Sequence, residues 1–431
     1  MAYKAHAKLV ATLILGMTSG YAAAAGFQLL EQNVSGLGNA YAGSAAVAEN
    51  ASTIFYNPAG MTQLKDREFS AGVAAIGPSF KFSDSGSNVG LLAGTGNGGD
   101  AGSWAYVPNA YLSAALNKDL YVGVGISAPF GLKTEYSSPW LGSAQSNSFS
   151  VETMNLNPSI AYRVSDKVSL GGGLNWQHID AKYKRLAAVE TASGVPGSVL
   201  VKAPVVATLA GDSWGWNLGG LFTLSPATKV GVSYRSSVNQ DTTGDVVTSS
   251  SIPAVNAAKS SNVKASLKLP DTFIASATHQ LDGKWQLLGD VSWTGWSSIP
   301  QLDLIRTSGA STGQSAQKLN TDFRDTWRFA VGANYQYSPD LKFKFGLGFD
   351  QTPVKGASTR LVSLPDNDRT ELSTGAQWKL SGGSTVDVGL AYLYFSDTSI
   401  ANDQTAEHRG LVQGNYTGSA WLLGVQYSVP F

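Results

Sequence analysis

The sequence contains no cysteine, so disulfide bridges and thiolate metal sites are excluded. Charged residues make up only 14% of the chain, whereas about a quarter is usual in soluble domains. The formal net charge is zero, which gives no indication of a nucleic-acid partner. Beyond the N-terminus, no apolar run is long enough for a transmembrane helix. A disulfide scaffold, a helical membrane protein and a basic nucleic-acid binder are therefore excluded.

Glycine and aromatic residues are abundant instead. The chain has 48 glycines, and phenylalanine, tryptophan and tyrosine together make up 10% of it. Many aromatics with few charges suit a protein that exposes much of its surface to lipid.

The N-terminus has the pattern of a secretory signal. Lys4 and Lys8 give a positively charged start, an apolar run follows at 9–17, and small residues follow at 22–25. The apolar run is too short to span a bilayer, so export and cleavage fit it better than anchoring. We expect residues 1–24 to be a signal peptide cut before Ala25, with a start at Gly26 as the close alternative.

Apolar residues alternate with polar or small ones along much of the chain after residue 67. At the C-terminus, Trp421, Leu423, Val425 and Tyr427 share one face while Gln426 lies on the other. The same period of two recurs in 327–337, 343–349 and 386–394, with aromatics near the segment ends. Long alternating strands with aromatic girdles are typical of a transmembrane β-barrel.

Short polar turns alternate with long loops along this region. The turns are expected at 117–119, 165–167, 225–228, 282–284, 338–340 and 381–383. The loops are expected near 84–103, 131–147, 184–211, 241–261, 299–320, 354–368 and 398–415. This asymmetry predicts an all-β fold, an antiparallel transmembrane barrel of about 14 strands over residues 67–431.

Residues 25–66 do not alternate and are rich in alanine and glycine. The segment is too long for a tail and too small for an independent domain. A barrel of this size would leak unless filled, so we expect 25–66 to form an N-terminal hatch inside the lumen.

Enzyme motifs occur in the sequence, but their surroundings do not match the structures that such motifs need. Residues 211–215 match G-x-S-x-G, but they lead into an alternating strand and not into the strand–turn–helix elbow that the motif needs. His178 and Asp180 share a strand face, which we interpret as polar lumen lining and not as a catalytic dyad. We expect no enzyme activity, cofactor or metal site.

Several motifs together resemble the FadL/TodX-type outer-membrane channels for long-chain fatty acids and hydrocarbons. The resemblance covers essentially the whole mature chain and is carried by 25–29, 35–43, 57–61, 127–136, 269–271, 293–297 and 365–369. It implies a 14-stranded barrel, a hatch, and substrate exit through the wall at a kinked third strand. It also implies that Asn57, Pro58 and Ala59 pack beside that kink.

The third strand itself carries a break signal. Its glycine-rich stretch includes Gly125, and Ser127 and Ala128 precede Pro129 and Phe130. Proline gives no N–H to the ladder, so the strand either simply ends there or opens a side exit into lipid. In the second case the Asn57 amide, which donates and accepts, is a candidate to close the unpaired backbone groups.

The functional hypothesis is passive uptake of hydrophobic compounds, first of all long-chain fatty acids, with lateral release into the membrane. Ala25, Gly26 and Phe27 belong to the expected gate, and Arg235 and Arg328 are candidate partners for a carboxylate. The apolar segment 184–211 is either a capture surface or packs over the barrel mouth.

Three alternatives stay open: uptake of aromatic hydrocarbons, a general porin and an adhesion barrel. Expected partners are the hydrophobic substrate, outer-membrane lipid and lipopolysaccharide, and the barrel assembly machinery, which would capture the last strand ending at Phe431. The expected location is the outer membrane.

Overall fold

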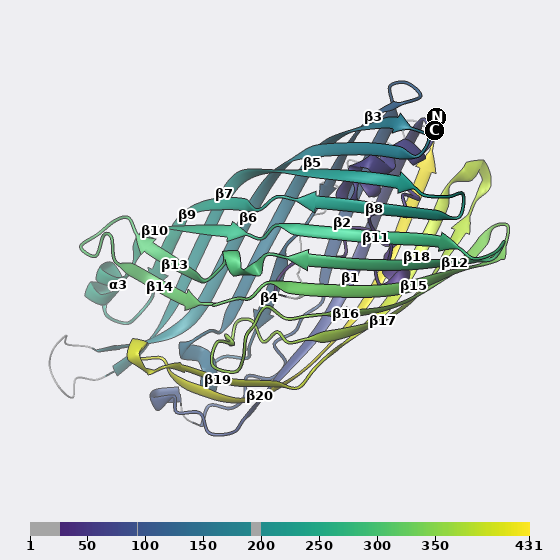
Figure 1. The fold of residues 1–431 in the computed structure, drawn as a ribbon. Coiled ribbons are helices and arrows are strands. Elements are labelled where there is room, and N and C mark those ends of the chain that lie inside the picture. The colour runs from purple at the N-terminus through teal and green to yellow at the C-terminus, as the bar shows by residue number, and fades with distance from the viewer. Residues whose placement is uncertain (1–25, 93, 191–199) are drawn as a thin grey trace.

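The computed structural model describes residues 26–92, 94–190 and 200–431 (Figure 1). The expected signal peptide, 1–24, and Ala25 lie outside the described residues. Within the described part of the chain, antiparallel strands join into one sheet that closes on itself where β1 pairs with β20.

The first half of the wall contains ten strands. They are β1 (Arg67–Asp84), β2 (Ala105–Ala115), β3 (Leu120–Ser127), β4 (Gly131–Glu135), β5 (Ser148–Ser165), β6 (Val168–Glu190), β7 (Leu200–Thr223), β8 (Thr228–Arg235), β9 (Val238–Thr248) and β10 (Ser261–Leu269). The second half contains β11 (Thr272–Gln280), β12 (Trp285–Thr294), β13 (Gln301–Arg306), β14 (Ser315–Asn320), β15 (Thr326–Ser338), β16 (Leu341–Asp350), β17 (Arg369–Lys379), β18 (Thr385–Phe395), β19 (Thr398–Gln404) and β20 (Gly410–Pro430).

Several crossings of the wall are interrupted, so each consists of two consecutive strands. These pairs are β3 with β4, β8 with β9, β10 with β11, β12 with β13, β14 with β15, and β18 with β19. Counted as crossings, the described strands form a closed barrel of 14 antiparallel strands, as the turn pattern predicted.

The alternation predicted from sequence divides the wall into an outer and an inner face. Trp421, Leu423 and Val425 are about half exposed on the outer face, whereas Leu422 and Gln426 on the inner face are buried. The outer face is thus apolar, as a membrane barrel requires, while the inner face carries both polar and apolar side chains that pack inside the barrel.

All six predicted short turns connect strands at the expected residues. The predicted long loops are partly wrong, because β4, β13, β14 and β19 lie inside them, β9 overlaps one of them, and 184–211 is largely the extended hairpin of β6 and β7 in its described part. Where strands rise beyond the membrane, their outer faces need no apolar residues, so their composition resembles that of loops.

The helical elements are all short. They are η1 (Leu37–Asn39), α2 (Thr53–Tyr56), η2 (Pro58–Gln63), η3 (Gly90–Leu92), η4 (Leu141–Ala144), α3 (Pro253–Lys259), η5 (Trp296–Ser298), η6 (Ser381–Gly383) and η7 (Thr405–Glu407). None of the helices in the described ranges is long and apolar enough to cross a membrane.

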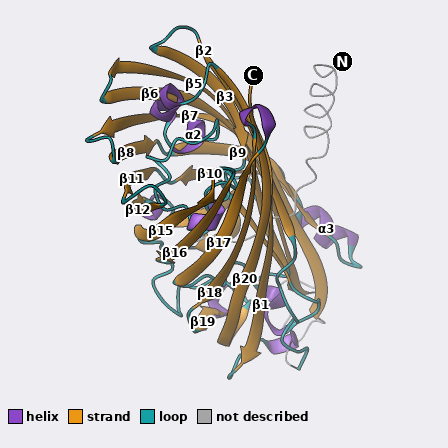
Figure 2. Cartoon of the chain, turned by 90° about the vertical axis from the view of Figure 1, so that its right-hand side faces the viewer, coloured by secondary structure: helices purple, strands orange, loops and turns teal. Residues whose placement is uncertain are grey.

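Residues 26–66, the hatch segment, carry η1, α2 and η2 and contact the inner face of many strands (Figure 2). Wall glycines let the two backbones touch. A Cβ at Gly231 would lie 1.9 Å from the Ala45 carbonyl oxygen, and one at Gly346 would lie 2.1 Å from the Asn39 carbonyl carbon. Side chains at these wall positions would push the hatch segment away.

Candidate functional site

The barrel wall is interrupted between β2 and β4. Pairing of β2 with β3 ends at Ala110 and Ile126, and among the described strands β4 pairs only with β5. Residues 127–130, which we call the kink, therefore have no pairing with β2. In a wall that spans a membrane, each backbone group left unpaired there must find another protein partner.

The hatch segment supplies those partners on the lumen side. The Gln32 amide brackets Ala128: the Ala128 N–H donates to Gln32 Oε1 at 3.1 Å, and Gln32 Nε2 donates to the Ala128 carbonyl at 2.8 Å. The Leu29 N–H donates to the Pro129 carbonyl at 2.9 Å. At Ala128 and Pro129 the break is thus closed by the hatch segment and not by β2.

The remaining kink groups are closed from two directions. The Thr153 hydroxyl of β5 accepts from the Phe130 N–H at 2.9 Å and donates to the Phe130 carbonyl at 2.7 Å. The Gly131 N–H donates to the Phe27 carbonyl at 2.8 Å. Phe27–Leu29 and residues 129–131 therefore run side by side as a single antiparallel bridge, which the Gln32 side chain extends to Ala128.

The expectation that Asn57 closes the kink is wrong. Asn57 Nδ2 donates to the carbonyls of Ala45 and Gly220, at 2.7 and 3.0 Å, so its amide joins the hatch segment to β7. A Cβ at Gly171 of β6 would lie 2.5 Å from the Ala59 nitrogen. Asn57, Pro58 and Ala59 therefore pack closely against the wall at β6 and β7. The role expected of Asn57 at the kink belongs to Gln32.

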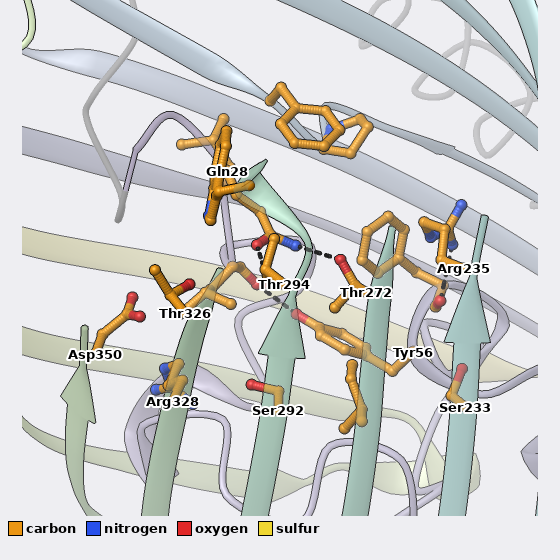
Figure 3. A pocket seen from close by; sticks show the side chains of 17 residues that line it. Gln28, Tyr56, Ser233, Arg235, Thr272, Ser292, Thr294, Thr326, Arg328 and Asp350 are labelled. Carbon is orange, nitrogen blue, oxygen red and sulfur yellow. Dashed lines mark hydrogen bonds between the residues drawn. The ribbon is translucent and has the colours of Figure 1, made fainter. Parts of the chain in front are cut away.

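A pocket lies between the hatch segment and the wall (Figure 3). Its polar lining side chains come from both sides, and Gln28 links Thr272 and Thr294 across it at 3.2 and 3.1 Å. The lining residues are Gln28, Leu29, Leu30, Phe55, Tyr56, Pro129, Phe130, Ser233, Arg235, Thr272, Ile274, Ser292, Thr294, Trp296, Thr326, Arg328 and Asp350. The pocket therefore borders the kink directly.

Arg235 ends β8 and points into this pocket (Figure 3). Its guanidinium donates to the Phe55 carbonyl at 2.9 Å and to the Asn175 amide oxygen, and it lies 4.2 Å from the centre of the Phe55 ring. Within the described ranges, no carboxylate forms an ion pair with Arg235. It is a partly buried cation whose partners are neutral.

Arg328 on β15 is more completely neutralised. It is 5% exposed, and its Nη2 donates to Glu371 at 3.1 Å and to the Ala40 carbonyl of the hatch segment at 2.7 Å. Of the two arginines expected to meet a carboxylate, Arg328 already has one, so Arg235 is the better candidate for a ligand.

A second cavity is lined by residues of β5, β6, β7, β13 and β14 together with Phe27 of the hatch segment. Apart from Thr242 and Thr321, its lining is apolar and includes Phe149, Val151, Ile179, Leu209, Leu302 and Leu319. Phe27 also lines it, and its ring centre lies 4.9 Å from that of Trp296, which lines the pocket beside the kink. The Phe27 ring thus lies where the two cavities approach each other.

The first described residue is held by an extracellular loop. The Gly26 N–H donates to Asp366 Oδ2 at 3.0 Å, and the Thr352 hydroxyl donates to the same oxygen at 2.6 Å. Burial raises the pKa of the Asp366 carboxyl to about 6. The contact fixes Gly26 and Phe27 above the pocket.

The other predicted residues take supporting places. Gly125 packs against the Tyr111 ring, with 2.7 Å from its would-be Cβ to the nearest ring atom, and Ser127 is buried at the end of β3. Sequence reasoning missed Gln32, Tyr56 and Asp366. A polar Gln32 inside an Ala/Gly-rich plug was a usable signal, but its partner lies 96 residues away.

The residues considered for catalysis are arranged differently from a catalytic site. Residues 211–215 lie within β7, so no elbow forms. His178 was expected to line the lumen, but it lies on the outer face, where its nitrogens contact Asp212 and Asp180 at 2.8 and 3.1 Å. Its neighbours Gln177 and Ile179 are the residues that point inward and are buried.

Comparison with known proteins gives a consistent relationship. Residues 15–431 match the family model described as outer membrane protein transport protein (OMPP1/FadL/TodX). The long-chain fatty acid transport protein of Escherichia coli K12 is 29% identical, with 98% of each chain covered.

Two solved structures share the fold. The crystal structure of a Pseudomonas aeruginosa FadL homologue superimposes with a TM-score of 0.85 at 21% identity, covering 94% of this chain and 99% of that one. The Ralstonia pickettii toluene transporter TbuX gives a TM-score of 0.68 at 19% identity, covering 93% and 99%. At these identities the likeness establishes the fold alone.

Proposed function

The chain belongs to the OMPP1/FadL/TodX family of outer-membrane transport proteins, and we propose that its substrates are long-chain fatty acids released sideways into the membrane. At the coarser level, family membership makes it an outer-membrane β-barrel channel for hydrophobic compounds and not an enzyme. The substrate and the exit route are the proposal.

The observation that carries the proposal is the position of Arg235. It lies in a pocket bordered by the kink, with neutral partners only. A partly desolvated guanidinium favours a carboxylate, and the neighbouring apolar lining suits an alkyl chain. A fatty acid satisfies both requirements, whereas a hydrocarbon leaves the charge without a counter-ion.

The exit at the kink is supported by the packing of the hatch segment. Straight passage to the periplasm would have to separate backbone contacts such as Gly231 with Ala45 and Gly346 with Asn39. Passage at the kink requires only that the hydrogen bonds of Phe27–Gln32 to residues 128–131 open. The second route breaks fewer contacts.

An engineered disulfide that holds the hatch segment to the kink, and that a reductant can open, tests this route. Gln28 and Phe130 face each other as an antiparallel bridge whose hydrogen bonds come from the flanking residues. Such pairs bring Cα atoms within disulfide range, about 4.5 Å. The double variant Gln28→Cys/Phe130→Cys should take up oleate only after reduction, while oxidised protein stays heat-modifiable on gels.

The two single-cysteine variants are the matched controls, since the wild-type chain contains no cysteine. Both should transport equally with and without reductant. If the oxidised double variant transports oleate at the rate of its reduced form, the substrate leaves by another route.

A second candidate function is uptake of aromatic hydrocarbons. The fold is shared with a protein described as a toluene transporter, and the second cavity, which Phe27 lines, is almost wholly apolar. Binding of oleate and of toluene to purified protein separates the two. Tighter toluene binding that is unaffected by Arg235→Gln would favour the hydrocarbon function.

Two partner assignments remain proposals. Trp421 and Tyr427 of β20 face outward, and Phe431 is 58% exposed beyond the strand end, which suits capture of the last strand by the assembly machinery. Contact with outer-membrane lipid and lipopolysaccharide is proposed for the outer face, where the ammonium group of Lys182 lines a polar groove and could bind a phosphate head group.

A further inference from the structure

The hatch segment carries a carboxyl group, Glu31, into the interior of the barrel. Its side chain is 5% exposed, and within the described ranges no lysine, arginine or histidine forms an ion pair with it. An ionised carboxylate that is buried without a contacting cation is costly, and such a group takes up a proton instead. Glu31 is therefore a candidate for a carboxyl group that stays neutral near neutral pH.

A second carboxyl group, Glu371 of β17, lines the same small pocket as Glu31. This pocket adjoins the one in Figure 3, since Arg328 and Asp350 line both. Arg328 donates to Glu371 Oε2 at 3.1 Å, so Glu371 is the ionised member of the two. In the described part of the chain, nothing donates to its other oxygen, Oε1, or to Glu31 Oε2.

A proton is the partner that fits both of these oxygens. Each oxygen is completely covered by protein, which leaves no room for a water molecule or a metal ion against it, whereas a proton needs no space. A protonated Glu31 can donate its O–H to Glu371 Oε1, and hydrogen bonds from O–H to a carboxylate are short and strong. Two carboxyl groups in one site share a proton because both cannot be ionised at once.

The charged and titratable groups around Glu31 come from three strands and from the hatch segment itself. They are Arg328 of β15, Asp350 of β16, Arg369 and Glu371 of β17, and Tyr41 and Tyr56 of the hatch segment. Arg369 Nη2 contacts Asp350 at 2.6 Å, so both arginines contact carboxylates other than Glu31. Glu31 belongs to the hatch segment and not to a membrane-spanning strand. Burial raises its pKa to about 7, and the charge of Glu371 acts in the same direction.

We propose that Glu31 and Glu371 form a proton-binding site, in which one shared proton holds the hatch segment against β17. The site goes beyond the proposed function, because no substrate takes part in it. When the proton leaves, two buried anions face each other, and the contact between the hatch segment and β17 weakens. The lumen of an outer-membrane channel is exposed to the external medium, so this contact responds to the pH outside the cell.

The direction of the response follows from the two protonation equilibria. The pKa of Glu31 is near 4.5 in the unfolded chain and about 7 in the folded protein, which therefore binds this proton more tightly. The stabilisation is fully present below the unfolded pKa and is lost as the pH rises through 7. The hatch segment is thus held most firmly in acidic surroundings.

Infrared spectra of the full-length barrel in detergent test whether the proton is there. A protonated carboxyl group absorbs apart from a carboxylate, so the wild type should show a band at pH 6 that is absent from Glu31→Gln and disappears by pH 8.5. Glu68→Gln is the matched control. Glu68 of β1 is also buried with an unpartnered oxygen, but it faces Lys65 and Glu49. The band assigned to Glu31 should persist in that variant.

Hydrogen exchange tests what the proton holds. The glutamine of Glu31→Gln can donate to Glu371 as the protonated acid does, but it has no proton to lose. Amides in 29–36 of the wild type, compared with Glu31→Gln at the same pH, should exchange roughly thirtyfold faster at pH 8.5 than at pH 6, because one proton changes the equilibrium by about tenfold per pH unit above 7. Amides of β5 (Ser148–Ser165) are the internal reference.

Each outcome decides for or against the site. A ratio of exchange rates that is the same at both pH values, or a Glu31→Gln variant that retains the infrared band, overturns the shared proton. Loss of the band in Glu68→Gln assigns it to Glu68 and overturns the site as well. If Glu31→Gln fails to give a heat-modifiable barrel, the wild type measured against its own β5 amides still decides, since only amides of the hatch segment should gain the additional response to pH.

Discussion

The hatch segment meets the barrel in two different ways on two sides of the lumen. Toward β16–β18 it is held by buried charges: Lys344 contacts Glu49 at 2.6 Å and Asp387 at 2.9 Å, and both Lys344 and Asp387 are almost fully buried. Toward the kink no ion pair within the described residues holds it; the contacts there are hydrogen bonds such as those of Gln32 with Ala128 and of the Gly26 N–H with Asp366.

The difference indicates which side can open. Separating a buried ion pair leaves an uncompensated charge, whereas separating amide hydrogen bonds leaves neutral groups that a water or a ligand can satisfy. We therefore expect the charged side to be a fixed hinge and the kink side to be the moving edge.

Removing the central charge of the fixed side should have the largest effect. Lys344→Met leaves Glu49 without its nearest cation and Asp387 without the cation it contacts, so the free energy of unfolding should fall by about 3–5 kcal/mol. Urea unfolding of the lipid-embedded barrel measures the loss.

Lys342→Met is the matched control for that variant. Lys342 also contacts Glu49, at 3.2 Å, but its side chain is 22% exposed. The loss should be clearly smaller. Equal losses in the two variants would show that burial of Lys344 does not distinguish the fixed side.

Loosening the moving edge should have an intermediate effect on stability and a visible effect on transport. Gln32→Leu removes both bonds to Ala128, so the hatch edge should open more often, at a cost of about 1–3 kcal/mol. Uptake of oleate into whole cells should become faster.

Gln28→Leu provides the comparison, because the Gln28 side chain bonds to Thr272 and Thr294 and not to the kink, which Gln28 meets only through its backbone. It should not accelerate uptake. Slower uptake in Gln32→Leu would indicate that Gln32 guides the substrate and does not restrain the edge.

The smallest effect should come from Asp366, which holds Gly26 at the start of the moving edge. Burial raises its pKa to about 6, so the folded protein binds this proton more tightly than the unfolded chain does. The associated stability is fully present below the unfolded pKa, near 4, and is lost as pH rises through 6.

Acidification from pH 7.5 to 5 should therefore stabilise the wild type relative to Asp366→Asn by about 1 kcal/mol. Parallel urea unfolding at the two pH values measures this difference. A difference that does not change with pH would mean that Asp366 does not titrate in this range.

The barrel could be predicted from sequence because its signals are local. The turns at 117–119, 282–284 and 338–340 are encoded by neighbouring residues, and alternation around Val388 and Val425 assigns their faces by geometry alone. Alternation of polar and apolar residues was less informative about the face of a side chain where strands extend beyond the membrane. His178 lies on the outer face although its polarity suggested the lumen, because solvent and lumen both accept polar side chains there.

The site required the tertiary structure. Alternation indicated that Arg235 and Arg328 face inward, but it could not reveal that Glu371 neutralises one of them and that Phe55 and Asn175 contact the other. Likewise a proline at 129 predicted a broken ladder, while the identity of the group that closes it, Gln32 and not Asn57, depended on how the hatch segment folds back. Strand and turn propensities act between neighbours in sequence, whereas these partners lie tens to hundreds of residues apart and meet only after the barrel has closed around the hatch.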